Sequence, residues 1–392
     1  MPTLVLDMGR GSIKIGFSTH DQPNEIEECS NLSGLYCIMP FKKGYLNNWD
    51  VQTQILDVAF KKTFNQHHLR TSDCNLIVTE PYFNFGSTKD TMNEVFFEEY
   101  QFSGLVRTNP AFLATYKYRA ESLQRLSRYS LVIDTGYSFT HLVPFGDGRI
   151  MREFVLRLPV GGKILTNRLV EAVSYRHLDV RGEVYIMNQC KEDACFVSTD
   201  FWKDLEATRS NLTSNPILRE YVLPDYAEVH RGYLRDPNQS SGGSLDPSSG
   251  KRSTLNSGNV LRLNNERFTV PELLFHPSDV GFREMGLTEA MSYLMCERLP
   301  PAVRPGAWAN CVVIGGNARF PGFLQRLKSD FRSLPPDDLA LNIFSPSDPQ
   351  IYAWQGGALL AEQPTDLQQY LVTKAEYEEH GTLFCEKRFP VC

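Results

Sequence analysis

Residues 131–145 read LVIDTGYSFTHLVPF, and this stretch decides the fold prediction. Its first residues are apolar and partly β-branched, which is typical of a buried strand. The strand ends in Asp134, Thr135 and Gly136, and a second apolar run over 140–145 predicts the return strand of a hairpin. Two interpretations stay open on these residues alone. The turn is either an ordinary polar hairpin turn, or one whose backbone N–H groups approach a phosphate while its acid holds a metal through water.

The same pattern occurs a second time near the start of the chain. Residues 4–17 read LVLDMGRGSIKIGF, with an apolar triplet, Asp7, one residue, Gly9 and a second apolar run. Asp7 and Asp134 are 127 positions apart, which is a domain-sized offset and not the short period of a solenoid. The repeat predicts two similar halves that face one another across a cleft.

The composition predicts a soluble globular protein with two or more domains, since 392 residues are 42% hydrophobic and 22% charged. A net charge of −6 argues against a generally basic surface for nucleic acid. The nine cysteines include no Cys-x-x-Cys pair, so no zinc site is expected. The odd cysteine count and the lack of a secretory signal predict reduced thiols in the cytosol or nucleus. No apolar run approaches the ~18 residues of a membrane span.

Periodicity and turn residues predict strands and helices in alternation along the chain. Residues 19–35 are polar and weakly patterned, which indicates a surface excursion. A helix is expected to begin after Asn48 or Asp50, and the apolar residues on its inner face are Val51, Ile55, Val58 and Ala59. Further strands are expected over 35–40, 75–79 and 309–314, and further helices over 89–100, 110–126, 164–173, 289–299, 323–331 and 354–361.

Residues 232–258 differ in composition from the rest of the chain. They are rich in Ser, Gly, Asn and Pro and contain almost no large apolar side chains. Such a segment cannot bury enough surface to offset its ordering entropy, so we predict a disordered insertion. Whether it is a tolerated surface insertion or an arm that contacts a partner stays open.

Three glycine-containing turns in this order resemble the actin superfamily. Residues 4–17 look like its first phosphate loop, 131–141 like its second, and VVIGGNARFPGF at 312–323 like its adenosine element. Further matching segments are GYLNNWD at 44–50, VGGKILTNRL at 160–169, CFVSTDF at 195–201, NERF at 265–268, and WQGGALL and TKAEYEEHG near the C-terminal end. Only the stretches 19–35 and 232–258 lack counterparts, so the resemblance covers most of the chain.

The resemblance implies an α/β, actin-like ATPase fold, with two RNase H-like domains of five-stranded cores around a nucleotide cleft. The first domain would comprise 1–118 and 352–392, with a shortened small subdomain at about 20–43. The second would comprise 119–351, with an outer subdomain at about 161–282.

The resemblance also implies a site for ATP or ADP with Mg²⁺. The residues that match the phosphate side are Asp7, Gly9, Arg10, Lys14, Asp134 and Gly136, and those that match the nucleoside side are Lys191, Glu192, Gly315 and Gly316. Asp7 and Asp134 would hold the metal through water. Several residues depart from the family pattern: Met8, Arg10, Tyr137, Ser138 and Gln350, the last near a family lysine that touches the adenine. Because Arg10 could either donate to a phosphate or fill its pocket, bound nucleotide and an empty cleft both stay open.

Hydrolysis in actin-like ATPases needs a water held by a glutamine and a histidine. The histidine is present as His141, but the glutamine position falls on Pro110, which has no side-chain amide. We therefore predict no catalytic residue and interpret His141 as a relic or a core histidine. The protein is expected not to be an enzyme, with a weak ATPase as the alternative.

Filament formation is also not expected. Only residues 20–44 separate the first hairpin from GYLNNWD, so the long loop by which actin grips the next subunit is largely missing. In the apolar plug that links actin strands, Asp279 stands where a large apolar residue is expected. A carboxylate is expensive to bury between subunits, so no self-polymerisation is predicted.

Within the family, EPYFNF, FEEYQF, DTGYSFTH, SYRHLDV and KEDACFVSTDF are most similar to a nuclear branch of actin-related proteins. That branch belongs to complexes that exchange variant Z of histone two-A into nucleosomes. The similarity implies a scaffold subunit in the nucleus, with the cytoplasm open as a second location. Its partners would be a helicase-like remodeller ATPase, a zinc-finger HIT-domain subunit, other subunits of the complex and, through them, nucleosomes. No membrane partner is expected. An active ATPase and a cytoskeletal protein are the alternatives.

Overall fold

The computed structural model describes residues 1–27, 30–31, 37–65, 69–121, 128–210, 215–225, 229–237, 260–336 and 339–390. Contacts between residues divide the chain into two compact units. Unit 1 comprises Met1–Pro159, Ala290–Arg319 and Phe331–Cys392, and unit 2 comprises Val160–Glu289 and Phe320–Asp330. Both Asp-x-Gly turns therefore lie in unit 1. The domain boundaries expected at 118/119 and 351/352 stay a prediction.

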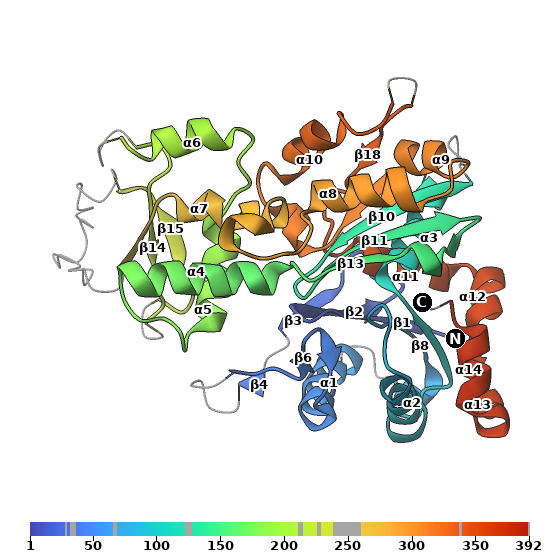
Figure 1. Cartoon of the computed structure of the whole chain (residues 1–392). Coiled ribbons are helices and arrows are strands. Elements are labelled where there is room, and N and C mark those ends of the chain that lie inside the picture. The colour runs from blue at the N-terminus through green and yellow to red at the C-terminus, as the bar shows by residue number, and fades with distance from the viewer. Residues whose placement is uncertain are drawn as a thin grey trace. The chain divides into compact units, whose positions relative to one another are not determined.

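Unit 1 is built on two sheets of six strands each (Figure 1). The first has the order β19-β9-β8-β1-β2-β3, and its strands are β1 (Thr3–Met8), β2 (Ser12–Phe17), β3 (Asn24–Glu27), β8 (Asn75–Thr79), β9 (Gly104–Thr108) and β19 (Val372–Thr373). The second has the order β12-β11-β10-β17-β18 with β13 also on β11, and its strands are β10 (Tyr129–Thr135), β11 (Thr140–Gly146), β12 (Arg149–Ile150), β13 (Leu156–Leu158), β17 (Cys311–Ile314) and β18 (Ile343–Phe344).

The two sheets repeat one plan. In the first, β1 pairs antiparallel with β2 and parallel with β8. In the second, β10 pairs antiparallel with β11 and parallel with β17. This confirms the two hairpins and the internal repeat. Each sheet has one strand more than the five expected, because β19 pairs with β9 and β12 pairs with β11.

The predicted surface excursion over 19–35 is wrong for its middle part. Residues Asn24–Glu27 form β3, which pairs antiparallel with β2. Ile26 is the only apolar residue of this strand, so alternation could not reveal it. Two short hairpins follow in the chain: β4 (Ser30–Asn31) with β5 (Cys37–Ile38), and β6 (Phe41–Lys42) with β7 (Tyr45–Leu46). The expected strand over 35–40 is thus reduced to β5, and residues 35 and 36 lie outside the described residues.

The helices of unit 1 are α1 (Trp49–Phe64), α2 (Gly86–Glu94), α3 (Pro110–Glu121), α9 (Arg304–Ala309), α11 (Tyr352–Glu362), α12 (Pro364–Tyr370), α13 (Lys374–His380) and α14 (Thr382–Arg388). The sequence predicted four of these eight helices, namely α1, α2, α3 and α11, and did not predict α9, α12, α13 and α14. Two more helices, α8 (Leu287–Ser292) and α10 (Phe323–Phe331), begin in unit 2 and end in unit 1. One π-helical turn, Val95–Glu99, continues α2, and another, Tyr293–Arg298, continues α8.

Helix α1 shows both a correct and a wrong detail of the prediction. Its cap is Asn48, whose side-chain oxygen accepts a hydrogen bond from the N–H of Val51 at 3.2 Å. Val58, expected inside, is 63% exposed. The buried face is instead centred near Gln52 and Thr63, two polar residues that an apolar pattern does not count.

Helices α3 and α11 pack together within one core that also includes residues of both sheets. A Cβ added to Gly356 of α11 would lie 2.1 Å from the carbonyl oxygen of Leu113 in α3, so the two helices meet at backbone contact. The indole Nε1 of Trp354 donates to the carbonyl of Val5 in β1 at 3.1 Å. These contacts fix the first turn of α3 beside the strands that carry the two Asp-x-Gly turns.

Unit 2 contains α4 (Gly162–Arg176), α5 (Val184–Ala194), α6 (Phe201–Ala207), α7 (Glu266–Thr269) and a three-stranded sheet of order β15-β14-β16. Its strands are β14 (Arg219–Val222), β15 (Tyr233–Arg235) and β16 (Val260–Leu263). The sequence did not predict this sheet. The expected disorder over 232–258 is wrong at its start, since Tyr233–Arg235 pairs with β14, and 238–259 lies outside the described residues.

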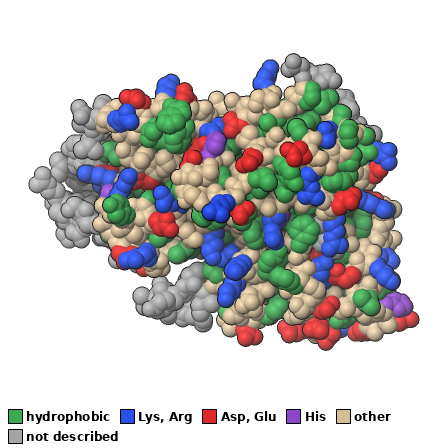
Figure 2. Space-filling view, viewed as in Figure 1, with side chains coloured by type: hydrophobic (Ala, Val, Ile, Leu, Met, Phe, Trp, Pro, Cys, Tyr) green, Lys and Arg blue, Asp and Glu red, His purple; other side chains and the backbone are tan. Residues whose placement is uncertain are grey.

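Charged side chains of both signs are interspersed over the face of the molecule shown in Figure 2. Within the described residues, no helix has the length and apolar character that crossing a membrane requires.

Candidate functional site in unit 1

The first turn holds an acid and an amine side by side. Asp7 lies in β1 opposite Lys14 of β2, and both side chains are buried. The hydroxyl of Thr79 donates to Asp7 Oδ1 at 2.7 Å and accepts from the N–H of Met8 at 2.9 Å. The Nζ of Lys14 donates to the carbonyl of Ser12 at 3.3 Å. Strand β8 therefore orients the carboxylate through Thr79, a residue that sequence reasoning did not single out.

The second turn holds Asp134 in a more enclosed setting. The hydroxyl of Tyr82 donates to Asp134 Oδ2 at 3.0 Å. The side chain keeps some solvent contact, but protein surrounds the carboxyl group, and this burial raises the pKa of Asp134 to about 7. The hydrogen bond from Tyr82 and the charge of Lys14 oppose the rise, while the charge of Asp7 adds to it. The Asp7 carboxylate of the first turn thus lies close enough to Asp134 to influence the protonation of Asp134.

Tyr82 links three parts of this region. Its hydroxyl also accepts a hydrogen bond at 3.0 Å from the N–H of Ala111, in the first turn of α3. Its ring lies against that of His141, with centroids 4.3 Å apart and planes tilted by 41°. The ring is 3% exposed, and Pro110, the first residue of α3, precedes its N–H partner. Tyr82 therefore stands between Asp134, His141 and the residue at the family glutamine position.

His141 is neutral in this environment. It is 7% exposed, and burial, helped by the charge of Arg157, lowers its pKa to about 3. Within the described residues, its Nε2 atom and the Oγ atom of Ser138 are buried without a hydrogen-bond partner. Orphaned buried polar atoms are rare and point to a ligand or an ordered water.

The third glycine turn meets the second one. Gly315 has a φ of +98°, and a Cβ there would lie 2.3 Å from the carbonyl oxygen of Thr135, so only glycine fits. The side-chain amide of Asn317 donates to Thr135 Oγ1 at 3.2 Å and to the carbonyl of Gly136 at 2.8 Å. The structure therefore brings Gly315 to the second Asp-x-Gly turn, and Asn317 is a further residue at this turn that the sequence did not reveal.

Two residues that depart from the family pattern contact one another. The guanidinium of Arg10 lies over the ring of Tyr137, 5.8 Å from its centroid. The missing Cβ of Gly11 would make ordinary van der Waals contact with Tyr137, at 3.5 Å. The first and second turns are thus joined by a cation–π contact between their tips.

A second departure, Gln350, takes part in a polar network at the edge of the first sheet. Its amide nitrogen donates to Ser12 Oγ at 3.3 Å and to the carboxylate of Glu25, and Ser12 donates to the same carboxylate at 2.7 Å. Arg319 donates to Gln350 Oε1 at 2.8 Å. Glu25 of β3, which fell in the supposed surface excursion, therefore links this edge to the residues beside Gly315 and Gly316.

Lys191 and Glu192 lie in unit 2, whereas the other predicted site residues lie in unit 1. The Nζ of Lys191 donates to the carbonyl of Gly162 at 3.2 Å, to Thr166 Oγ1 at 3.1 Å and to Asn188 Oδ1 at 2.7 Å. Burial lowers the pKa of Lys191 to about 8. Glu192 accepts from the Asn188 amide at 2.8 Å. Both side chains are thus engaged within their own unit.

The residues of unit 1 fit the phosphate end of a nucleotide. They supply a buried amine on Lys14, the two orphaned atoms on Ser138 and His141, and two carboxylates. The described residues contain no group of three or more His, Cys, Asp or Glu that could cage a metal. Mg²⁺ needs no such cage, because it keeps most of its waters and binds through one or two carboxylates plus phosphates.

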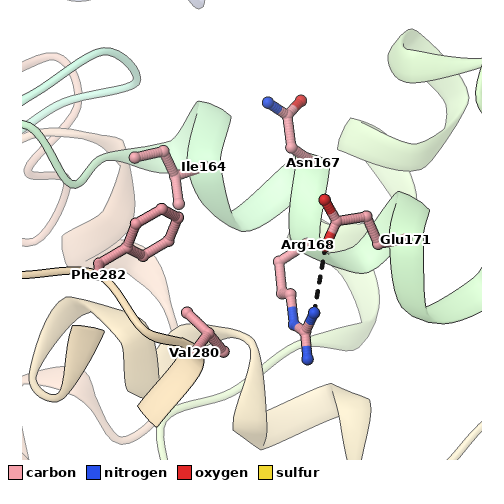
Figure 3. A pocket seen from close by; sticks show the side chains of 6 residues that line it. All are labelled: Ile164, Asn167, Arg168, Glu171, Val280 and Phe282. Atoms are coloured by element: carbon pink, nitrogen blue, oxygen red, sulfur yellow. Dashed lines mark hydrogen bonds and ion pairs between the residues drawn. The ribbon is translucent and has the colours of Figure 1, made fainter. Parts of the chain in front are cut away.

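A separate hollow of about 260 Å³ lies in unit 2 between α4 and the segment after α7 (Figure 3). Its lining residues are Ile164, Asn167, Arg168, Glu171, Val280 and Phe282. Arg168 donates to Glu171 at 3.1 Å, so the charges of these two side chains are paired. The lining offers no nucleophile or metal ligand set, and we assign no chemistry to it.

The two matching sheets and the acid–glycine turns at their central strands define an actin-like α/β protein. The family model described as Actin matches residues 25–390, and the chain belongs to the actin family. It is 39% identical to actin-related protein 6 of Drosophila melanogaster, covering 96% of this chain and 97% of that protein. It is 35% identical to actin-related protein 6 of Neurospora crassa, covering 99% and 94%. The protein of the same name in Oryza sativa subsp. indica is 32% identical, covering 98% of each chain.

Proposed function

We propose that the chain is a non-filamentous, actin-related scaffold subunit of a chromatin-remodelling complex. In this proposal the complex exchanges variant Z of histone two-A into nucleosomes and thereby contributes to transcription regulation. Two features support it: the similarity over nearly the whole length to proteins named actin-related protein 6, and the segments that resemble the nuclear branch of the family. The observation that carries the scaffold role is the packing of Tyr82 on His141.

That packing argues against hydrolysis on physical grounds. A hydrolytic water must be held by at least two polar groups in line with the reacting phosphate. Pro110 has no side-chain amide to offer, and the ring of Tyr82 covers the imidazole of His141. The hydroxyl of Tyr82 is already bound to Asp134 and to the N–H of Ala111. ATP or ADP with Mg²⁺ is the proposed ligand of unit 1, held by Asp7, Lys14 and Asp134 without turnover, and an empty site is the alternative.

The outer surface supports a partner-binding role in place of self-assembly. Asp279, in the segment that corresponds to the actin plug, is exposed, so a filament contact there would have to desolvate its carboxylate. Large aromatic side chains are exposed on unit 2 instead. Tyr175 is 89% exposed and Trp202 is 76% exposed. Exposed Tyr and Trp side chains of this size are typical anchors of protein interfaces.

Capture from nuclear extract tests the proposal. The tagged full-length chain should recover a helicase-like remodeller ATPase, a zinc-finger HIT-domain subunit, further subunits and, through them, histones. Variants Tyr175→Ser and Trp202→Ser, with Val58→Ser on the other unit as the control, would then show whether the exposed aromatics contribute. Recovery of the chain as a free monomer only would reject the scaffold proposal. Localisation of the tagged chain outside the nucleus would reject the proposed location.

Steady-state turnover distinguishes the scaffold from an active ATPase. Purified protein with ATP and Mg²⁺ should release phosphate no faster than buffer does, and His141→Ala should leave that background unchanged. Clear turnover that falls on His141→Ala would favour the ATPase alternative.

A further inference from the structure

Tyr82 makes contacts that a tyrosine buried only for packing would not need. Its hydroxyl donates to one site carboxylate, Asp134, and accepts from the first turn of α3, while its ring covers His141. Both hydrogen-bonding functions of the hydroxyl are therefore directed to groups of the site. A core tyrosine is usually satisfied by one partner, which is often a backbone carbonyl or water.

We propose that Tyr82 is a positioning residue that closes the hydrolysis position of this site from within. It holds the carboxylate of Asp134 and the imidazole of His141 in one arrangement, and it keeps water out of the space beside the first turn of α3. A phosphate chain held by the two glycine turns then stays intact. This inference adds a residue role to the proposed non-catalytic scaffold. It rests on that proposal, in which the site binds nucleotide without hydrolysing it.

The contacts of Tyr82 explain three features at once. The N–H of Ala111 would otherwise point an unsatisfied donor, at the positive end of the helix dipole, towards the site. Asp134 would otherwise lose its hydroxyl donor. The face of His141 that is turned to Tyr82 would be open to solvent, while its contact with the ring of Phe139 would remain. All three groups therefore contact one side chain that is 3% exposed.

Histidine titration tests the inference on the whole protein without added ligand. In protein labelled with ¹³C-histidine, and assigned with His141→Gln, the His141 signal should stay unchanged between about pH 5 and 8. It should stay unchanged in Tyr82→Phe, which keeps the ring. In Tyr82→Ala it should begin to change within that range, with a pKa still below the ordinary value of about 6.5 because the charge of Arg157 remains. Tyr116→Ala is the matched control, since its hydroxyl donates to Asp366 at 2.6 Å elsewhere on α3. If the His141 signal does not change between about pH 5 and 8 in folded Tyr82→Ala, the inference is wrong.

Hydrogen exchange keeps the inference testable if Tyr82→Ala does not fold. Tyr82→Phe keeps the ring and removes the hydroxyl, which is the acceptor of the Ala111 N–H and the donor to Asp134. The Ala111 amide should therefore exchange about tenfold faster, while amides in the last turn of α3 should not change. Unchanged exchange at Ala111 would contradict the assignment. With ATP and Mg²⁺ added, bound ATP should persist in wild type and Tyr82→Phe and convert to ADP at least about tenfold faster in Tyr82→Ala. If bound ATP persists equally in wild type, Tyr82→Phe and Tyr82→Ala, Tyr82 does not exclude water from the site. Neither result would affect the capture of partners, which tests the proposed function separately.

Discussion

A buried charge cluster beside the site gives the sharpest stability prediction. Arg107 of β9 is fully buried, and its Nε lies 3.2 Å from Glu80 Oε2. Its Nη1 donates to Asn93 Oδ1 at 2.7 Å and to the carbonyl of Lys89 at 2.9 Å, while its Nη2 pairs with Glu386 of α14. Burial lowers the pKa of Arg107, and the charge of Glu80 opposes that shift. The cluster joins the end of β8, α2 and the C-terminal helix around two cations, because Lys89 also pairs with Glu386, at 3.1 Å.

The change Glu80→Gln keeps the shape of the side chain and removes its charge. Arg107 then remains buried with Glu386 as its carboxylate partner, and the side chain of Glu386 is 31% exposed. Removing one partner of a buried ion pair costs about 3–5 kcal/mol, and we expect the lower end because Glu386 remains. With a shift of about 2–4 °C per kcal/mol for a domain of this size, the midpoint of thermal unfolding should fall by about 6–12 °C.

Thermal unfolding followed by circular dichroism at two heating rates measures this loss and shows whether unfolding is reversible. Asp147→Asn is the matched control, since Asp147 pairs with Arg128 on the surface where the two side chains are 60% and 67% exposed. The control should leave the midpoint unchanged. The double change Glu80→Gln with Arg107→Met should regain part of the loss, because the buried cation is gone. A midpoint for Glu80→Gln equal to that of the control would refute the reasoning.

Three further predictions concern the site and its supports. The folded chain binds the Asp134 proton more tightly than the unfolded chain, with a pKa of about 7 against 3.8, so stability should fall as pH rises through about 4 to 7. Asp134→Asn should flatten that decline in midpoints measured against pH, and an unchanged decline would contradict it. Gly356→Ala places a Cβ 2.1 Å from the Leu113 carbonyl and should cost about 2 kcal/mol or more in urea unfolding, whereas Gly381→Ala, with open space around it, tests φ strain alone. ATP with Mg²⁺ at about 100 times its Kd should add about 2.7 kcal/mol of stability in a thermal-shift assay, and no shift at saturating levels would indicate an empty site.

The sequence predicted those parts of the fold in which neighbouring residues determine the backbone conformation. The apolar runs beside Asp7 and Asp134 gave both hairpins, because a buried strand ending in an acid and a glycine is a local pattern. Asn48 was recognisable as a helix cap for the same reason. The three-stranded sheet of unit 2 was not, since β15 has three residues and β14 and β16 have four each. Strands this short carry too little alternation to predict.

Only part of the candidate site could be predicted from the sequence, because the contacts that support it join distant parts of the chain. Thr79 reaches Asp7 across 72 positions, Asn317 reaches Thr135 across 182, and Gln350 reaches Ser12 across 338. No periodicity encodes such pairs. The signal that could have found Tyr82 was its place directly after the strand-breaking Glu80-Pro81, where a chain leaving a buried strand enters the site edge.

Some buried polar groups of the site have hydrogen-bond partners within the described residues, and others have none there and are therefore available to a ligand. Asp7 accepts a hydrogen bond from the hydroxyl of Thr79, and Asp134 accepts one from the hydroxyl of Tyr82, so each carboxylate has a protein donor. Ser138 Oγ and His141 Nε2 have none within the described residues. An unsatisfied buried polar atom costs about 1–3 kcal/mol, so a purely structural core would gain by replacing both with apolar groups. Their presence next to the second glycine turn supports the proposal that this turn binds a polar ligand, which in that proposal Tyr82 and Pro110 leave uncleaved.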